Sequence, residues 1–160
     1  MPIFEHVFTV KAPLSEVATF HDDPVSLVAI TLPPVSVTIQ RFDRPVRAGS
    51  RVIFRLSVGV FGVTWDGTIA EYVDQKYFRD VQDKGPFGAW SHTHTFVAES
   101  DGTRVIDRVE YEPPFGSIGK LLNPILVRPA LAYLFAYRAK KTREILEQGR
   151  QTLTHTAVYR

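Results

Sequence analysis

The sequence predicts an α+β protein in which a seven-stranded, curved antiparallel sheet wraps around a long C-terminal helix. Three observations predict this class. Seven β-rich runs separated by Gly- and Pro-containing turns fill most of the chain between residues 3 and 112. Only two short helices interrupt them, both after the first strand, so parallel strands lack the crossover helices that they need. A long helical pattern with one apolar face then follows.

The N-terminal quarter contains the first strand and both short helices. Pro13 ends the strand, and Val17 and Phe20 lie three residues apart on one face of the first helix. Asp23 followed by Pro24 is an N-cap signal with proline at the first helical position of the second helix. The expected elements are a strand at 3–11 and helices at 15–21 and 25–31.

Six further strands follow, and two of the connections between them carry strong turn signals. Gly59–Gly62 predicts a tight hairpin, and Asp101-Gly102 is a typical hairpin dipeptide. Pro113–Gly116 closes the β region. The expected strands are 35–41, 51–58, 63–74, 76–82, 89–100 and 103–112.

The C-terminal helix has to bury an apolar stripe, into which Arg138 and Thr142 also fall. Only the concave side of the sheet offers a large enough apolar surface, and the space between them is a natural small-molecule cavity. Pro124 and Pro129 predict a kink or break early in the helix, and Gly149 is a plausible C-cap after Gln148. The stripe consists of Leu131, Leu134, Phe135, Ile145 and Leu146.

Composition narrows the function classes. We expect one ligand-binding domain over residues 1–150 and a C-terminal tail over 151–160. The absence of cysteine excludes disulfides, thiol nucleophiles and iron–sulfur clusters, and a formal net charge of +2 does not indicate a nucleic-acid partner. Residues 1–7 carry no secretory signal and we find no apolar run of about 20 residues. We therefore expect a cytoplasmic protein without stable membrane insertion; its oligomeric state is not indicated.

Alternation along one strand places two histidines inside the sheet. Trp90, His92, His94 and Phe96 point to the same face, and the flanking aromatic residues indicate that this face is the interior. A buried imidazole needs a partner. We therefore predict that at least one histidine hydrogen-bonds a polar residue of a neighbouring strand, and that a carboxylate partner raises its pKa. The expected partners are Asp80, Gln82 and Asp107.

Four interpretations of this polar cluster stay open. It can be a hydrogen-bond network that holds strand register, or a set of polar contacts to a ligand. It can also perform acid–base catalysis, with His92, His94, Asp80 and Asp107 as the candidate catalytic residues. The His-x-His pattern with a nearby carboxylate has the ligand types for zinc, but three ligands must converge. We therefore predict no metal and no cofactor.

The other candidate ligand-binding residues are mostly aromatic. Trp65 alternates with apolar residues on its strand, and Phe87 and Phe115 lie in Gly/Pro turns that can flank a cavity mouth. The complete predicted set is Trp65, Gln82, Phe87, Trp90, His92, His94, Phe96, Tyr111, Phe115, Leu131, Leu134 and Phe135.

One block of motif residues comprises Phe78–Gln82, Gly85–Phe87, Trp90–Phe96 and Asp107–Tyr111. This block and the element order resemble the helix-grip fold of the SRPBCC superfamily, which includes START-type lipid-transfer domains and aromatic polyketide cyclase/dehydrase proteins. The resemblance covers residues 3–148, and block 78–116 is its most specific part. It implies a ligand-binding fold with a deep apolar cavity, and it implies no particular reaction.

Two functions follow as expectations. The first is binding or transport of a hydrophobic small molecule, such as a lipid, an isoprenoid or an aromatic polyketide-like compound, in the internal cavity. The alternative is a cyclase or dehydratase in which the inward histidines and carboxylates move protons.

Overall fold

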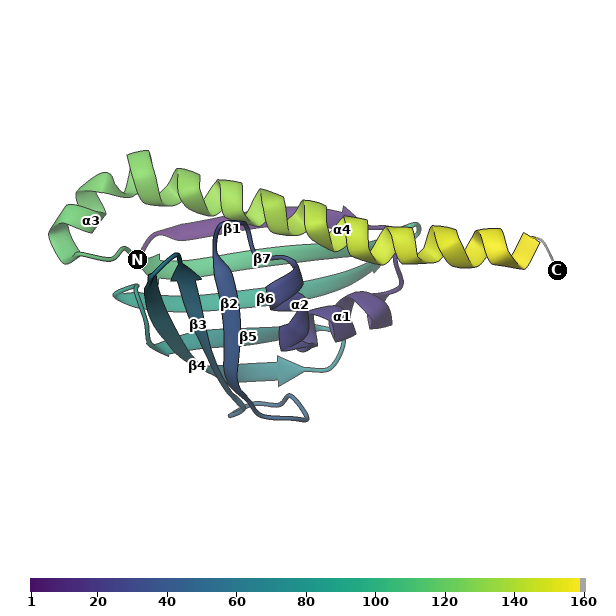
Figure 1. Ribbon diagram of the computed structural model, residues 1–160, viewed down its shortest axis with the longest axis horizontal. Coiled ribbons are helices and arrows are strands. Elements are labelled where there is room, and N and C mark those ends of the chain that lie inside the picture. The colour runs from purple at the N-terminus through teal and green to yellow at the C-terminus, as the bar shows by residue number, and fades with distance from the viewer. Residues whose placement is uncertain (159–160) are drawn as a thin grey trace.

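A computed structural model describes the backbone of residues 1–158 and the side chains of residues 1–148. It contains the predicted elements in the predicted order (Figure 1). They are β1 (Ile3–Val10), α1 (Leu14–Asp22), α2 (Pro24–Ala29), β2 (Ser36–Phe42), β3 (Arg51–Val58), β4 (Phe61–Val73), β5 (Tyr77–Lys84), β6 (Ala89–Glu99), β7 (Gly102–Glu112), α3 (Gly116–Leu122), the π-helical turn η1 (Asn123–Val127) and α4 (Arg128–Val158).

The seven strands form one antiparallel sheet in the order β1-β7-β6-β5-β4-β3-β2. This confirms the predicted fold class. Consecutive strands from β2 to β7 are neighbours because short turns join them, and β1 pairs with β7 at the opposite edge. The sheet curves, so that β2 and β3 lie in front of the central strands (Figure 1).

Local signals in the N-terminal part behave as expected. The Asp23 side chain caps α2 by accepting a hydrogen bond from the backbone N–H of Val25 at 3.0 Å, and Pro24 is the first helical residue.

The β3–β4 turn is shorter than predicted: Val58 pairs with Phe61, leaving Gly59 and Val60 as the turn. Gly59 has a φ of 57°, which a residue without a Cβ adopts readily.

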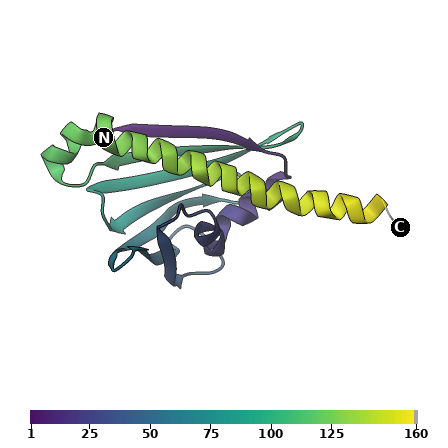
Figure 2. The same ribbon diagram turned by 45° about the horizontal axis from the view of Figure 1, so that its top comes forward.

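Helix α4 lies along β1 on the inner face of the sheet and continues past the sheet's end (Figure 2). The predicted end near Gln148 is wrong, because the helical backbone runs through Gly149 to Val158. One glycine costs a helix only about 1 kcal/mol relative to alanine, and no proline follows it. Gly149 is therefore not a C-cap, and the predicted tail at 151–160 is helical as far as residue 158; its side chains lie outside the described residues.

The predicted break before α4 is confirmed as a change of helix type. Pro124 lies in the first turn of η1, and Pro129 is the second residue of α4. A proline is tolerated in a first turn because its missing N–H would have no intrahelical partner there. The segment Gly116–Gln148 is long and apolar enough to span a membrane by length and composition. Leu131 and Phe135 of this segment are buried against the sheet, but only 17% of its most apolar 18-residue window is buried.

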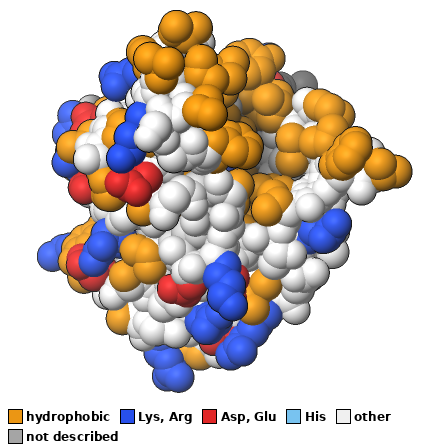
Figure 3. Space-filling model, turned by 90° about the vertical axis from the view of Figure 1, so that its left-hand side faces the viewer, with side chains coloured by type: hydrophobic (Ala, Val, Ile, Leu, Met, Phe, Trp, Pro, Cys, Tyr) orange, Lys and Arg blue, Asp and Glu red, His pale blue; other side chains and the backbone are white. Residues whose placement is uncertain are grey.

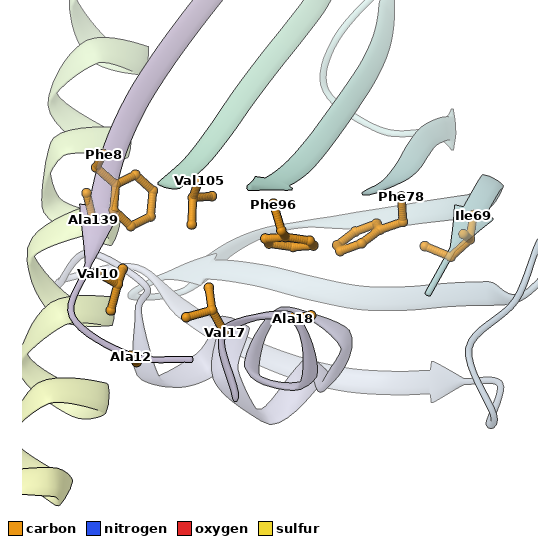
Figure 4. Close-up of a cluster of buried hydrophobic side chains, with 10 residues drawn as sticks. All are labelled: Phe8, Val10, Ala12, Val17, Ala18, Ile69, Phe78, Phe96, Val105 and Ala139. Carbon is orange, nitrogen blue, oxygen red and sulfur yellow. The ribbon is translucent and has the colours of Figure 1, made fainter. Parts of the chain in front are cut away.

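Two hydrophobic clusters hold the helices on the sheet. One joins β1, β6 and β7 to α1, with Phe8, Phe96 and Val17 among its members (Figure 4). The other lies toward α3 and contains the two tryptophans together with Leu131 and Phe135. Burial of these large side chains is the main stabilising contribution to the fold.

Candidate functional site

A cavity of about 350 Å³ lies between the inner face of the sheet, helices α1 and α2, and α4. This volume is in the range of small-molecule sites, about 300–1,000 Å³. Apolar side chains make up most of its wall. At the α3 end of the molecule, hydrophobic side chains gather around a recess (Figure 3). The apolar residues that line the cavity include Leu27, Ile30, Phe42, Val46, Val52, Phe54, Leu56, Trp65, Ile69, Phe78, Phe87, Trp90, Leu131 and Leu134.

Strand register brings the predicted polar residues together. Across β5 and β6, Asp80 lies directly opposite His92. Across β6 and β7, His94 lies directly opposite Asp107. Opposite residues in an antiparallel pair share a face, so both carboxylates point to the same side as the histidines. His92 and Asp107 are buried, whereas His94 and Asp80 are half-buried and face the cavity.

The two imidazoles lie between the two carboxylates. His92 Nε2 hydrogen-bonds Asp107 Oδ1 at 3.1 Å, which confirms the predicted partner. His94 Nδ1 is 2.9 Å from the same oxygen, but it is off the line of a hydrogen bond and acts as a short ion pair. On the other side, Asp80 Oδ2 lies 3.7 Å from His92 Nδ1 and 3.7 Å from His94 Nε2. The ring centroids of the two histidines are 3.8 Å apart.

Only one of these histidines favours the charged form. Burial opposes charge on His94, but Asp107 and Asp80 outweigh burial and raise its pKa to about 9. Burial also opposes the charge on Asp107, yet contacts with both histidines hold its pKa below the usual range. Burial and the neighbouring charge of His94 lower the pKa of His92, despite its carboxylate partners. The predicted rise is therefore confirmed for His94 and wrong for His92, because burial and the charge of the adjacent His94 both oppose a charge on His92.

Two further polar residues at the cavity were not assigned from the sequence. His21 of α1 donates from Nδ1 to the Val17 carbonyl at 2.7 Å, and its ring lies 5.8 Å from that of His94. Burial and the charge of His94 lower its pKa to about 4, so His21 is neutral. The sequence signal that could have identified His21 is its position four residues after Val17, which places it on the same face of the helix as that buried residue.

Arg138 of α4 is the second of these residues. It lines the cavity with its guanidinium 5.6 Å from the Phe135 ring, and no ion pair is found for it among the described residues. Burial lowers its pKa, although the fields of Asp107 and Asp80 oppose that change. The signal was a cation in the middle of an apolar helical stripe, four residues after Leu134.

Most of the predicted ligand-binding residues line the cavity. Trp65 stacks on Phe54 with ring centroids 5.8 Å apart and meets Trp90 edge-on at 5.3 Å. These contacts fix an aromatic part of the cavity wall. The predicted ligand-binding residues that line the cavity are Trp65, Phe87, Trp90, His92, His94, Leu131 and Leu134, and the candidate catalytic residue Asp80 lines it as well.

Five predicted residues do not line it, each for an identifiable reason. The Gln82 amide donates to the Phe87 carbonyl at 2.8 Å and accepts from the Phe87 N–H at 3.3 Å, so it holds a turn instead of joining the histidines. Phe96 packs in the core at α1, and Phe135 packs between Phe4 and His92.

Tyr111 is fully buried and donates to Asn123 Oδ1 at 2.8 Å, which directs its hydroxyl toward η1. Phe115 is 85% exposed at the start of α3. Phe115 therefore does not line the cavity, whereas Phe87 is at the cavity wall. The candidate catalytic residue Asp107 contacts both histidines but does not itself line the cavity.

Comparison with known proteins gives structural matches only. No protein-family model matches the chain, and no curated protein matches it. A protein of Chromobacterium violaceum has a similar structure, with a TM-score of 0.74 at 16% identity over 92% of this chain and 99% of that one. A Thermus thermophilus protein gives a TM-score of 0.67 at 22% identity, covering 88% and 97%.

The Zhui aromatase/cyclase of a Streptomyces species is a further structural match. Its TM-score is 0.63 at 18% identity, over 90% of this chain and 95% of that one. Identities this low show a shared fold and leave function open. With its antiparallel seven-stranded sheet, two short helices after β1 and long C-terminal helix, the chain has a helix-grip fold.

Proposed function

We propose that this protein binds or carries a hydrophobic small molecule, such as a lipid, an isoprenoid or an aromatic polyketide-like compound, in the cytoplasm. The observation that carries the proposal is the cavity of about 350 Å³ with its mostly apolar wall. Packed cores leave few voids of this size, and apolar surface that faces water is stabilised when a ligand covers it.

The test uses a matched pair of substitutions on α4. Leu134 lines the cavity, whereas its neighbour Tyr133 is 66% exposed. Leu134→Trp should fill the space and weaken uptake of the apolar fluorophore N-phenyl-1-naphthylamine at least tenfold, and Tyr133→Trp should leave uptake unchanged. A folded Leu134→Trp variant with undiminished uptake would refute the proposal, as would a wild-type protein without uptake. Native mass spectrometry of the purified protein identifies any ligand that co-purifies.

A second candidate function is a cyclase or dehydratase. The observation that favours it is His94, which lines the cavity and lies between the carboxylates of Asp80 and Asp107. A histidine held by a carboxylate is an arrangement that general acid–base catalysis uses. One of the solved structures similar to this chain is described as an aromatase/cyclase.

Histidine substitutions separate the two functions. In a dehydratase, His94→Gln should retain uptake, and the compound extracted from it should be heavier by one water than that from wild type. If the compounds extracted from His94→Gln and from wild type were identical, and if both proteins converted substrate in cell extracts at the same rate, catalysis by His94 would be excluded. His92→Phe and His94→Phe add a structural test: unchanged melting with lost uptake marks a ligand contact, and lowered melting with retained uptake marks a structural network.

A further inference from the structure

One oxygen of Asp80 is equally distant from two imidazole nitrogens. Asp80 Oδ2 lies 3.7 Å from His92 Nδ1 and 3.7 Å from His94 Nε2. Both separations exceed the about 2.7–3.2 Å of an N–H···O hydrogen bond. They are close to the about 3.4 Å between two ligand atoms that are each about 2.0–2.1 Å from a tetrahedral zinc ion. This spacing fits an ion between the three atoms better than a shared proton.

Asp107 orients the imidazoles from the opposite side. His92 Nε2 is hydrogen-bonded to Asp107 Oδ1, and His94 Nδ1 is 2.9 Å from the same oxygen. When His92 Nε2 donates, its Nδ1 carries the lone pair, and that nitrogen is the one near Asp80. Histidines that ligate metals commonly have a carboxylate on the ring nitrogen that does not bind the metal. Asp107 has the position of this outer partner.

The donor atoms and charges indicate the class of ion. Two imidazoles and one carboxylate suit zinc and other first-row divalent metals, whereas calcium and magnesium prefer oxygen ligands. Asp80 and Asp107 together supply two negative charges, which balance one divalent cation in a mostly buried position.

The remaining side of the cluster faces the cavity. Asp80, His92 and His94 all line it, and their ligand atoms lie within 4.8 Å of one another. Three protein ligands with one open position are typical of catalytic zinc sites, in contrast to the four-ligand structural sites. Arg138 lines the same space, so an oxygen atom of a ligand at the open position would lie among positive charges.

From this geometry, we propose that Asp80, His92 and His94 bind a divalent transition metal of the zinc class, with Asp107 as the outer-shell carboxylate and one coordination position open to the cavity. The His-x-His motif alone does not predict this site. The convergence of a third ligand from β5, at equal distance from both imidazoles, is what carries the proposal.

Metal titration of the full chain tests the site directly. The protein is treated with a chelator, desalted and titrated with zinc chloride in a calorimeter. We expect one zinc ion per chain. Asp80→Asn should weaken zinc affinity by about 100-fold, since loss of an outer-shell partner alone costs about 10–100-fold. Cobalt(II) chloride alone should produce the visible absorption of four- or five-coordinate cobalt in wild type and not in Asp80→Asn.

The matched control is His21→Gln, which removes a cavity histidine next to His94 that is not among the three ligands. It should retain zinc affinity. Wild-type protein that takes up no zinc would overturn the proposal, as would zinc binding that is unchanged in Asp80→Asn and His94→Gln. If a variant does not fold, the proposal is tested by the cobalt spectrum of the wild-type protein alone. A spectrum of six-coordinate cobalt would overturn the proposed site. Fluorophore uptake, measured in the same samples, tests the hydrophobic cavity independently.

Discussion

The two walls of the cavity are built in different ways. The wall of β5 and β6, with Asp107 of β7 behind it, places two histidines beside two carboxylates, and each close contact there depends on the register of the neighbouring strands. The wall of β3, β4 and α2 consists of large apolar side chains such as Phe54, Trp65 and Ile30. Polar contacts are directional and tolerate little displacement, whereas apolar packing depends mainly on volume.

This difference teaches where the cavity is sensitive to change. A substitution on the polar wall leaves a buried charge or an imidazole without its partner, which costs more than the lost contact itself. A substitution on the apolar wall alters the shape of the cavity and the apolar area that is buried. Because part of that wall faces the cavity, its side chains are less tightly packed than those of a filled core, and the substitution costs less stability.

The largest expected effect is that of Asp107→Asn on the polar wall. The change removes the negative charge that His92 and His94 share, and His94 is left without its closest counter-charge. We expect the free energy of unfolding to fall by about 3–4 kcal/mol, as for other broken buried ion pairs. Urea denaturation at pH 7 measures it. Asp101→Asn, on the exposed β6–β7 turn, is the control and should change stability little. A loss below about 1 kcal/mol for Asp107→Asn would show that the two walls do not differ in this way.

The next effect is a pH dependence that belongs to the polar wall alone. The pKa of His94 is raised from its ordinary 6.5 to about 9, so its contribution to stability is fully present below pH 6.5 and is lost as pH rises toward 9. At about 1.4 kcal/mol per pH unit, stability should fall by about 2 kcal/mol between pH 6.5 and 8.

Denaturation with a chelator in every sample measures this dependence without metal. The other charged or titratable groups around His94 are Asp80, Asp107, His92, His21 and Arg138. In the folded protein, the pKa values of both carboxylates and both histidines lie below their ordinary values and therefore below this window. His94→Gln should therefore have a shallower profile over the same range. An equal slope in this variant would assign the dependence to another group.

On the apolar wall, Trp65→Leu should have a smaller effect on stability than Asp107→Asn. The ring contacts Phe54, Phe87 and Trp90, but it also borders the cavity, so part of its area is not packed. We expect a loss of about 1–2 kcal/mol, below the about 3–5 kcal/mol typical of truncating a large aromatic residue to alanine in a packed core. Thermal unfolding measures it, with Thr64→Ser on the same strand as the exposed control. A loss as large as that of Asp107→Asn would contradict the comparison.

The smallest effect is expected for Gln82→Leu, at the edge between the walls. The amide makes two hydrogen bonds with the backbone of Phe87, and their loss should cost about 1 kcal/mol. Denaturant unfolding measures the cost, and exposed Lys84→Gln is the control. If fluorophore uptake fell while stability stayed unchanged, Gln82 would be a ligand contact as the sequence predicted, and its assignment to the turn would be wrong.

Local signals explain which predictions from sequence are confirmed. The cap at Asp23, the Gly59 turn and the alternation from Trp90 to Phe96 depend on residues close in the chain. The end of α4 was misplaced because a single glycine is only a mild helix breaker when no second stop signal follows.

By itself, the sequence determined the seven strands, the short helices, the inward face of β6 and the set of polar residues from which partners are drawn. Only the tertiary structure decided which partners meet. Strand register pairs Asp80 with His92 and Asp107 with His94, while Gln82, two residues from Asp80 on the same strand, binds a turn. The docking of α1 and α4 brings His21 and Arg138 to the cavity across long stretches of chain. Alternation specifies a face within one strand, but distances between elements depend on register and packing, which no local pattern contains.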